Sequence, residues 1–463
     1  MPLKELFMVR KDPSRVRHRI AIVFPSLRKI SYYTLGYQII YRMLNSYDDV
    51  AAERLTYDSV LSIESNIPLK EFDIVLVSSN FEMNYPYLAQ IIKRSGIDVR
   101  EKKVLVGGIT TFNPGPLLGM GFYVTPSDAE KIIPILYEYD FDIESLVDEG
   151  LVISPEEMNP VRVLRAESIE HEYSRIQILP ENPNVRILLE LTRGCPFRCR
   201  FCMYGNVRNY VTYKSLEGVI EDVTFWKRYY ITRNIEIISS EPFSNPYLNE
   251  IVDHLAKENF YFSFPSIRVD RDYTHVLEVL DRVGNRTITI APEHSERIRQ
   301  ILGKSFTNDQ IIEFGKELKR YKNIRKIKLY IMVGVIGEEL EDFLEIKDLI
   351  ENLKRVSGKQ IDYSVNFLVP KPFAENLSLL SYESIRDLMK TSKVLAKMFG
   401  VNIDPRKAYI QAIMSLGGPE IGKKIVEDPM NATKFSYWRR FIEKELGYDP
   451  IKEPWNYKKV IRL

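Results

Sequence analysis

Cysteine is nearly absent from this sequence, and the three cysteines that occur stand together. Cys195, Cys199 and Cys202 are the only ones in 463 residues. A disulfide would leave one thiol over and suits an oxidising compartment, which nothing else in the sequence indicates. Isolated cysteines are not expected to group at ligand spacing. The grouping therefore predicts a shared ligand role, and it leaves no cysteine for a second cysteine-ligated centre.

Strong net charge and long apolar runs are also missing. Lys and Arg number 65 against 63 Asp and Glu, so the net charge of +2 produces no global field that favours nucleic acid or membrane, although a local basic patch is not excluded. No apolar run approaches bilayer length, and residues 1–19 are too charged for a secretory signal, so we expect a cytoplasmic protein. The chain is long enough for two or three domains.

The cysteine spacing suits one inorganic centre. A four-iron cube held by three cysteines leaves one iron without a protein ligand, and that iron can take a substrate or cofactor chelate. Structural zinc normally has four protein ligands, and the nearest histidines, His171 and His254, are distant in sequence. A [4Fe-4S] cluster is therefore the favoured interpretation. Zinc completed by a histidine that folds back, and a chance grouping of thiols, are the weaker alternatives.

The motif Cys195-x3-Cys199-x2-Cys202, with Phe201 before the last cysteine and a strand-like run at 185–191 before the first, resembles the signature of the radical S-adenosylmethionine (SAM) superfamily. The resemblance implies that the amine and carboxylate of SAM chelate the open iron. One electron then cleaves the sulfonium and yields methionine and a 5′-deoxyadenosyl radical, which abstracts hydrogen from the substrate. It also implies an electron donor such as ferredoxin or flavodoxin.

Residues 19–140 follow a short basic tail, 1–18, and alternate between strand-like and helix-like patterns. This alternation predicts an α/β domain with a doubly wound parallel sheet, whose ligands bind beyond the carboxyl ends of the strands. We expect strands at 19–25, 50–55, 72–79, 103–108 and 122–124, and helices at 33–44, 85–96 and 129–137.

This order resembles the Rossmann-like, cobalamin-binding domain that precedes many radical SAM barrels. The resemblance makes cobalamin a candidate cofactor and places Gly107 and Gly108 where the backbone can approach its nucleotide tail. The Asp-x-His-x-x-Gly segment of members with a histidine ligand is missing, and some members bind no cobalamin. An ordinary tight turn explains the two glycines equally well.

Residues 141–184 are rich in proline and read as a linker. From 185 to 380 a second series of strands and helices predicts a partial (β/α)6 barrel of the TIM type, with chemistry at the carboxyl ends of its strands. Residues 381–463 read as a mainly helical cap that closes the open side of the barrel. The expected barrel strands are 185–191, 234–239, 261–269, 286–291, 326–333 and 363–369, and the helices are 215–229, 246–257, 275–283, 308–321 and 339–356.

Polar residues after these strands resemble the SAM-binding segments of the superfamily. Glu241 occupies the place of the acid that accepts from the SAM amine, although it could simply be favoured by a helix dipole. Ser266 and Arg268 end the third strand. Arg268 suits a bidentate grip on the methionyl carboxylate or an ordinary ion pair with Asp270.

Later strand ends complete the expected site. Glu293, Ser295 and Arg297 resemble the turn near the SAM ribose and carboxylate, and Ser295 could be only a helix cap. Gly334 lies in a Gly-x-x-Gly-Glu segment that resembles the turn packed against adenine, and a plain strand-to-helix connection is its alternative. Phe201 completes the set of expected cofactor contacts.

The resemblance implies a radical SAM enzyme that acts on a small-molecule or lipid substrate. Our first hypothesis is cobalamin-assisted methylation of an unactivated carbon. The alternatives are carbon–carbon bond formation or rearrangement without methyl transfer, and an iron–sulfur electron carrier or redox sensor that is not an enzyme. Methylthiotransferases resemble this architecture, but they need three further cysteines that this sequence lacks.

Overall fold

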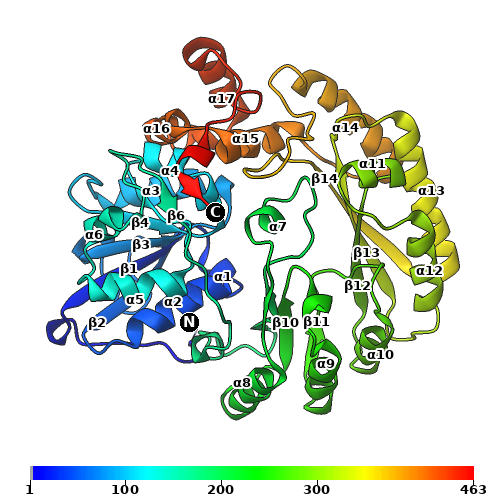
Figure 1. Ribbon diagram of the computed structural model, residues 1–463, viewed down its shortest axis with the longest axis horizontal. Helices are drawn as coiled ribbons and strands as arrows, with labels where there is room; N and C mark the ends of the chain where they lie inside the picture. The colour runs from blue at the N-terminus through cyan, green and yellow to red at the C-terminus, as the bar shows by residue number, and fades with distance from the viewer. Residues whose placement is uncertain (1–3) are drawn as a thin grey trace. The chain divides into compact units, whose positions relative to one another are not determined.

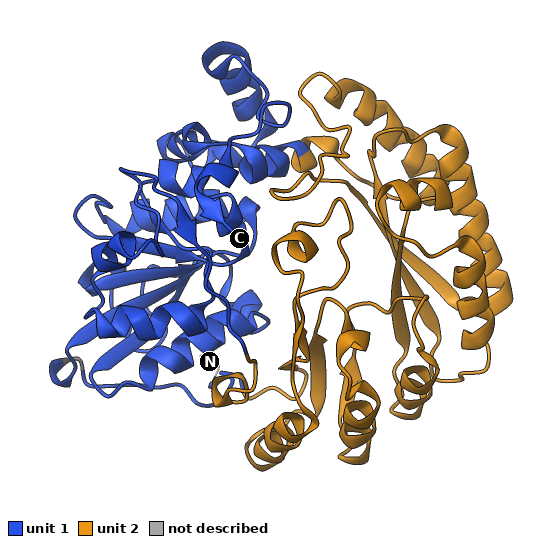
Figure 2. Cartoon of the chain, in the orientation of Figure 1, with its two compact units in different colours: residues 1–167, 176–180, 409–463 blue, residues 168–175, 181–408 orange. Residues whose placement is uncertain are grey.

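The computed structural model describes residues 4–463 and has a mixed α/β architecture with parallel sheets. The chain divides into two compact units (Figure 2). Unit 1 comprises residues 1–167, 176–180 and 409–463, and unit 2 comprises 168–175 and 181–408. No helix in the described part of the chain is both long enough and apolar enough to cross a bilayer.

Unit 1 contains a five-stranded parallel sheet in the order β2-β1-β3-β4-β5 (Figure 1). Residues 20–23 of β1 are fully buried, because this inner strand lies between β2 and β3 and is covered on both faces. Each predicted strand and helix of this region is present, with ends that differ by at most two residues. The strands are β1 (His18–Phe24), β2 (Val50–Thr56), β3 (Ile74–Ser78), β4 (Val104–Gly107) and β5 (Tyr123–Val124), and the helices include α2 (Leu35–Asn45), α3 (Tyr85–Ser95) and α5 (Ala129–Glu138).

Residues 141–184, which we expected to be a linker, contain regular structure. The helix α6 (Ile143–Asp148) is followed by the short strand β6 (Val161–Arg162). This strand pairs in parallel with β15 (Ile461–Arg462) near the end of the chain. Two-residue strands give little periodic signal, so the sequence alone did not reveal this pairing.

Residues 381–463, expected as one cap, divide between the units. The helix α14 (Ile385–Phe399) belongs to unit 2, whereas α16 (Pro419–Glu427) and α17 (Phe435–Phe441) belong to unit 1. In unit 1, α16 packs closely on α4 (Gly115–Gly119) through glycines. A Cβ on Gly119 would lie 1.9 Å from the Pro419 carbonyl oxygen, and one on Gly422 would lie 1.8 Å from that of Pro116.

Unit 2 contains two three-stranded parallel sheets, in the orders β11-β10-β7 and β12-β13-β14. In β13 every second residue is buried, so its apolar side chains pack under the flanking helices. The strands are β7 (Ile187–Glu190), β10 (Asn234–Ile238), β11 (Tyr261–Ser263), β12 (Thr287–Glu293), β13 (Lys326–Val333) and β14 (Gln360–Phe367). The helices between them are α8 (Leu216–Tyr229), α9 (Leu248–Lys257), α10 (Thr274–Arg282), α11 (Glu296–Ile301), α12 (Asn308–Leu318) and α13 (Leu340–Ser357).

The third strand of unit 2 is shorter than the sequence predicts. We expected it to run from 261 to 269, but β11 ends at Ser263. Pro265 has no N–H to donate to a sheet, so the ladder stops before it. The next segment turns toward β12, where the Ile267 N–H donates to the Thr289 carbonyl at 2.8 Å. Ser266 and Arg268 therefore lie in a loop rather than on a strand.

Candidate functional site

The three cysteines lie on a loop that a short antiparallel ribbon closes. The strands β8 (Thr192–Arg193) and β9 (Thr212–Tyr213) form the ribbon. Gly194 has a φ of 98°, and a Cβ there would lie 1.8 Å from the Tyr210 carbonyl oxygen. The Cys195 N–H donates to the Arg208 carbonyl at 2.9 Å. Only glycine fits the point where the loop leaves the ribbon, and this fixes the position of the first cysteine.

The second and third cysteines form a turn that leads into α7 (Met203–Val207). The Cys202 N–H donates to the Cys199 carbonyl at 3.0 Å, and the Asn206 side-chain amide donates to the Cys202 carbonyl at 2.8 Å. Gly205 is required in α7 because a Cβ would lie 2.2 Å from the Phe197 carbonyl oxygen. The backbone of the loop is thus held closed by its own hydrogen bonds.

All three cysteines are free thiols, and they act on one another electrostatically. Burial, helped by the neighbouring thiolates of Cys202 and Cys199, raises the pKa of Cys195 to about 11. Burial likewise raises the pKa of Cys199, against the lowering effect of Lys304 and Arg268. Within residues 4–463, no three His, Cys, Asp or Glu side chains are grouped as a site for a single metal ion.

The loop is anchored to two later segments of unit 2, one after α11 and one after β14. The Arg200 N–H donates to the Leu302 carbonyl at 3.0 Å, and its guanidinium donates to both carboxylate oxygens of Glu375 at 2.8 and 2.5 Å. Gly303, with a φ of 80°, lets the segment after α11 approach Cys199, since a Cβ there would lie 3.6 Å from the Cys199 Cα. Phe201 packs against a buried apolar cluster made of Ile298, Leu302, Val335 and Leu368.

Glu241 lies beyond β10, as the sequence predicts, and is almost completely buried. Its carboxylate accepts from the Phe243 N–H at 3.2 Å and so caps the short 3-10 helix Pro242–Ser244. It also faces Arg271 at 3.8 Å and Arg268 at 3.9 Å, distances too long for hydrogen bonds. Burial raises the pKa of Glu241, and the two guanidinium groups partly oppose that rise. The carboxylate therefore has room for another donor.

Arg268 forms an ion pair with Asp270, which the sequence offered as the alternative to binding the methionyl carboxylate. Its guanidinium donates to both oxygens of Asp270, at 2.9 and 2.5 Å. Its guanidinium carbon also lies 3.7 Å from the centroid of the Phe197 ring in the cysteine loop. Arg268 is thus close to the expected cluster, but its bidentate face is already occupied.

Sequence reasoning missed Arg271. Its guanidinium carbon lies 4.9 Å from the centroid of the Phe197 ring, so it borders the same loop. Its Nε is buried and has no hydrogen-bond partner. A buried donor left unpaired costs about 1–3 kcal/mol, which a ligand acceptor would recover. Arg271 lies two residues beyond the strand expected at 261–269, and no motif marks it in the sequence.

Glu293 and Lys304 form an ion pair beside the middle cysteine. Glu293 ends β12 with a φ of 65° and is mostly buried. Lys304 pairs with its carboxylate and also donates to the Ala291 carbonyl at 3.0 Å. The positive charge of Lys304 partly opposes the rise in the pKa of Cys199 that burial causes. Glu293 therefore lies near the cysteine loop as expected, but with a partner that the sequence did not suggest.

Ser295 and Arg297 contact protein groups. The Ser295 hydroxyl caps α11 by accepting from the Ile298 N–H at 3.4 Å and donates to Asp342 at 2.6 Å. Arg297 donates to Asp342 at 2.5 Å and to the Gly337 carbonyl at 2.8 Å. Both residues therefore connect α11 to the start of α13, and the capping interpretation of Ser295 is confirmed.

Gly334 lies in a turn that the carboxylate of Glu338 holds in place. Its φ is 76°, and its N–H donates to both oxygens of Glu338, at 3.0 and 2.8 Å. Glu338 also accepts from the Val335 N–H and lies 3.2 Å from the buried His294 ring. Glu338, the last residue of the Gly-x-x-Gly-Glu segment, thus stabilises the turn that follows β13.

Gly107 and Gly108 lie in unit 1 at the end of β4. Gly108 has a φ of 114°, and a Cβ there would lie 2.3 Å from the Ser79 carbonyl oxygen. The Thr110 hydroxyl bonds to the Ser79 hydroxyl at 2.8 Å in the same turn. Gly108 therefore accommodates the neighbouring strand end of the protein, and a Cβ on Gly107 would make only ordinary contacts with Thr125.

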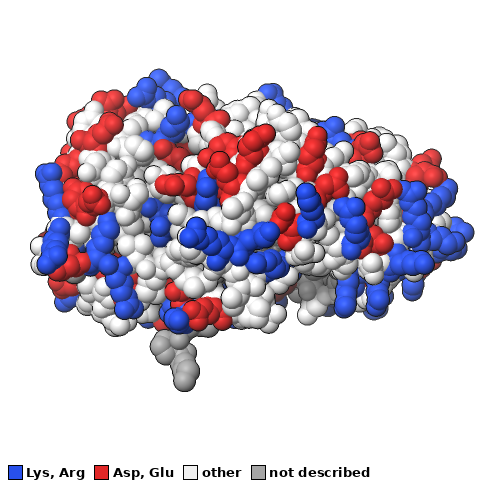
Figure 3. All heavy atoms as spheres, turned by 90° about the horizontal axis from the view of Figure 1, so that it is seen from below, with Lys and Arg blue, Asp and Glu red and all other residues white. Residues whose placement is uncertain are grey.

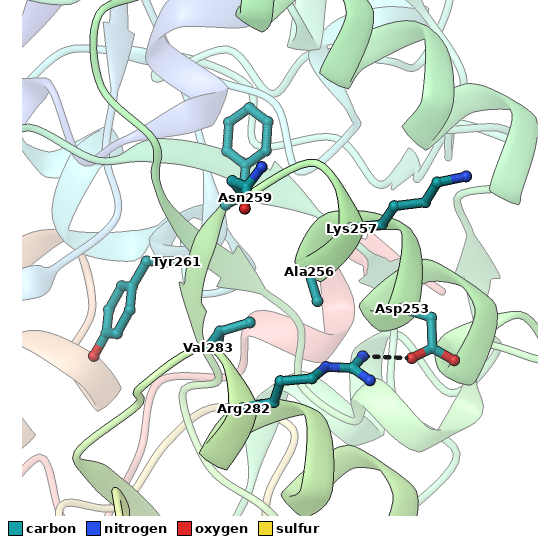
Figure 4. Close-up of a pocket in the computed structure, with 8 residues that line it drawn as sticks. Asp253, Ala256, Lys257, Asn259, Tyr261, Arg282 and Val283 are labelled. Atoms are coloured by element: carbon teal, nitrogen blue, oxygen red, sulfur yellow. Dashed lines mark hydrogen bonds and ion pairs between the residues drawn. The ribbon is translucent and has the colours of Figure 1, made fainter.

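A separate pocket of about 590 Å³ lies between α9, α10 and the first residue of β11 (Figure 4). An ion pair between Arg282 and Asp253, 2.8 Å long, spans one side of it. The pocket is at the amino-terminal end of β11, whereas the cysteine loop follows the carboxyl end of β7. Its lining comprises Asp253, Ala256, Lys257, Asn259, Phe260, Tyr261, Arg282 and Val283, none of which is a predicted site residue.

Two family models match the chain. The model described as "Radical SAM superfamily" matches residues 189–350, which include the three cysteines and most of unit 2. The model described as "Radical SAM proteins, N-terminal" matches residues 36–144 of unit 1. The two matches lie in the order that the sequence predicts.

The curated proteins that this chain resembles include distant relatives. An uncharacterized protein of Methanocaldococcus jannaschii is 24% identical over 455 residues, which are 94% of this chain and 97% of that protein. Ribosomal protein uS12 methylthiotransferases RimO of Clostridium kluyveri and Clostridium perfringens are each 24% identical, over 36% and 57% of this chain. The chain covers 40% and 64% of their respective lengths, less than two thirds of either.

Among solved structures, Streptococcus suis SuiB bound to precursor peptide SuiA is 14% identical. The match covers 48% of this chain and 50% of that chain, with a TM-score of 0.35, which is too low to support an argument about the fold.

Proposed function

Because this chain belongs to the radical SAM superfamily and is an enzyme of that class, we propose that Cys195, Cys199 and Cys202 hold a [4Fe-4S] cluster at which SAM is reductively cleaved. When bound, the cluster and SAM would supply a 5′-deoxyadenosyl radical for hydrogen abstraction. The observation that carries the proposal is the closed cysteine loop, whose three free thiols influence one another while no fourth cysteine exists in the sequence. Three ligands on a cube leave one iron for the cofactor.

The charges beside the loop suit the amino-acid end of SAM. Glu241 offers a buried carboxylate with two cations beyond hydrogen-bonding distance, which favours an ammonium as its partner. Arg271 offers a buried Nε–H without an acceptor, which favours a carboxylate. SAM carries both groups on one carbon. We therefore propose that Glu241 receives the amine and Arg271 the carboxylate, while Arg268 positions the loop through Phe197.

The strand-end glycines of unit 1 do not fit a cobalamin cradle. Gly108 must lack a Cβ because a Cβ there would collide with the backbone of Ser79. The segment directly after β1 contains no histidine that could serve as a ligand. The threonine and serine hydroxyls at this edge already bond to each other and to the backbone. We therefore base no step on cobalamin and favour the alternative hypothesis, in which the radical chemistry is completed on the substrate as carbon–carbon bond formation or rearrangement.

The chemistry of the distant methylthiotransferases is also not transferred to this chain. With all three cysteines in one loop, none remains to ligate a second cluster. We propose that the substrate is a small molecule or a lipid, that the reaction takes place in the cytoplasm, and that a reduced ferredoxin or flavodoxin supplies the electron. If the two sheets β11-β10-β7 and β12-β13-β14 together form the partial barrel that we propose, the substrate would bind at the carboxyl ends of their strands.

Anaerobic purification followed by incubation with SAM and dithionite tests the proposal. We expect 5′-deoxyadenosine in the wild type and none in Cys199→Ala. Cobalamin that copurifies with the wild type in stoichiometric amount would contradict the cobalamin-independent form of the proposal. An intact cluster that yields no 5′-deoxyadenosine would contradict SAM cleavage and favour an electron carrier.

A further inference from the structure

Three neighbouring turns of unit 2 contain basic residues and no acidic ones. They lead into β12, β13 and β14 and span residues 282–287, 319–326 and 354–360. Each of the three contains at least two Lys or Arg and no Asp or Glu. The net charge of the whole chain is only +2, so acids elsewhere in the sequence balance this local excess.

Backbone hydrogen bonds join the three turns into one edge. The Arg325 N–H donates to the Arg286 carbonyl at 2.9 Å, and the Gln360 N–H donates to the Arg325 carbonyl at 3.0 Å. Strands in a sheet lie about 4.8 Å apart, so the side chains of these turns project from a continuous surface. In the view from below, Lys and Arg gather at the end of the face where α12 and α13 lie (Figure 3).

Ordinary ion pairs account for part of this charge. Lys326 pairs with Asp362 at 2.6 Å, Arg320 with Glu278 at 3.4 Å, and Arg282 with Asp253 at 2.8 Å. Six further basic residues are exposed and form no ion pair with an acid in the part of the chain that the structure describes. These residues, which we call the basic edge, are Arg286, Lys319, Lys322, Arg325, Lys354 and Arg355.

Helix dipoles explain only some of the six. Cations in the last turn of a helix are favoured by the partial negative charge there, and this applies to Lys354 and Arg355 at the end of α13. Lys322 and Arg325 come after α12 has ended, and Arg286 comes after α10.

One acid, Asp281, borders the three turns, and its carboxylate accepts from the Asn323 and Ile324 N–H groups at 2.6 and 3.1 Å. A single carboxylate offsets only part of six positive charges. Like charges that gather repel one another, so the folded chain alone does not account for the cluster.

We propose that the basic edge binds the phosphate backbone of a nucleic acid. Regularly spaced phosphates are the ligand that several unpaired Lys and Arg side chains recognise without a pocket. A protein partner would require an apolar centre, and none of the exposed large hydrophobic residues lies in the three turns. The edge is at the amino-terminal ends of the strands, whereas the cysteine loop follows a carboxyl end. Binding here is therefore independent of the proposed SAM cleavage.

Fluorescence anisotropy with labelled 20-nucleotide RNA and with duplex DNA of the same length, at several KCl concentrations, tests the proposal on the full chain. We expect binding that weakens as salt rises, since each phosphate contact releases counterions. In the double variant Lys322→Glu/Arg325→Glu, the affinity should fall and the salt slope should shrink by about 2, one unit for each lost contact. Comparison of RNA with DNA shows which nucleic acid binds more tightly.

The matched control is Lys70→Glu/Lys423→Glu, which changes two exposed lysines of unit 1 and the net charge by the same amount. It should leave both the affinity and the slope unchanged. Equal losses in the two double variants, no salt-dependent binding in the wild type, or binding of polyglutamate with no binding of either nucleic acid would each overturn the proposal. Production of 5′-deoxyadenosine should be the same in all three proteins, which separates this test from that of the proposed function.

Discussion

The guanidinium carbon of Arg268 lies 3.7 Å from the centroid of the Phe197 ring. Phe197 stands between the first two cysteines, and Arg268 is itself fixed by two hydrogen bonds to Asp270. A cation over an aromatic face contributes about 0.5–2 kcal/mol, more where water is excluded. This contact therefore connects the loop after β11 to the cysteine loop, and it leaves Arg271 as the cation with an unused donor.

Replacing Arg268 and Arg271 one at a time should separate the positioning of the cysteine loop from the binding of SAM. Arg271→Gln should keep the cluster but weaken SAM binding about tenfold or more, because a hydrogen bond to a charged group contributes about 1.5–3 kcal/mol. Arg268→Gln should instead lower the iron content, since the loop loses its anchor. Equilibrium dialysis of SAM and iron analysis measure the two effects.

Arg282→Gln is the control for this pair, because Arg282 pairs with Asp253 at the other end of the strands. It should retain both iron and SAM affinity. Wild-type affinity for SAM in Arg271→Gln, with full iron content, would show that the methionyl carboxylate is held elsewhere.

Gly194 and Gly150 both have positive φ, 98° and 65°, but only Gly194 has a close neighbour. Gly150→Ala should cost only the backbone strain of about 1–2 kcal/mol. Gly194→Ala should cost more and should reduce iron incorporation, because its Cβ would lie 1.8 Å from the Tyr210 carbonyl oxygen. Urea unfolding and iron content are the measurements. Equal losses in both variants would mean that the loop adjusts around the added methyl group.

The Asp342 carboxylate should make the free energy of unfolding depend on pH in the acidic range. Burial raises the pKa of this carboxyl, but hydrogen bonds from Ser295, the Glu339 N–H and Arg297 together hold it below its ordinary value. A carboxyl whose pKa is lower in the folded state stabilises the fold above its unfolded pKa of about 3.9, and this contribution disappears as the pH falls through the folded value.

Asp342→Asn should therefore destabilise the protein at pH 7, and its difference from the wild type in urea midpoint should shrink between pH 5 and pH 2. Asp348→Asn, an exposed position on the same helix, should show little difference at either pH. A gap between Asp342→Asn and wild type that stays constant across this range would contradict the role assigned to the charge.

The sequence predicted the strands of unit 1 within two residues because buried strands that alternate with amphipathic helices produce strong periodic signals. It also predicted the cysteine loop, since the three thiols are chemically distinctive. It did not predict that residues 409–463 join unit 1. That packing depends on close contacts of Gly119 and Gly422, which have no periodic signature.

Site residues were harder to predict than the fold, because spacing does not reveal pairing. Arg268 and Arg271 both flank Asp270 in the sequence. The structure shows that Arg268 donates to Asp270, whereas the Arg271 Nε has no hydrogen-bond partner. Ser295 and Arg297 were expected near SAM, but their hydrogen bonds go to Asp342 and Gly337. The Lys304 partner of Glu293 is distant in sequence and carries no motif.

Iron and sulfide analysis of anaerobically reconstituted wild type and Cys199→Ala, combined with electron paramagnetic resonance of the reduced proteins with and without SAM, tests the central claim most directly. We predict four iron and four sulfide per wild-type chain, as a [4Fe-4S] cluster requires. We also predict a signal that changes when SAM is added, and the loss of both in the variant. One tightly bound zinc per wild-type chain, with no sulfide, would contradict the account.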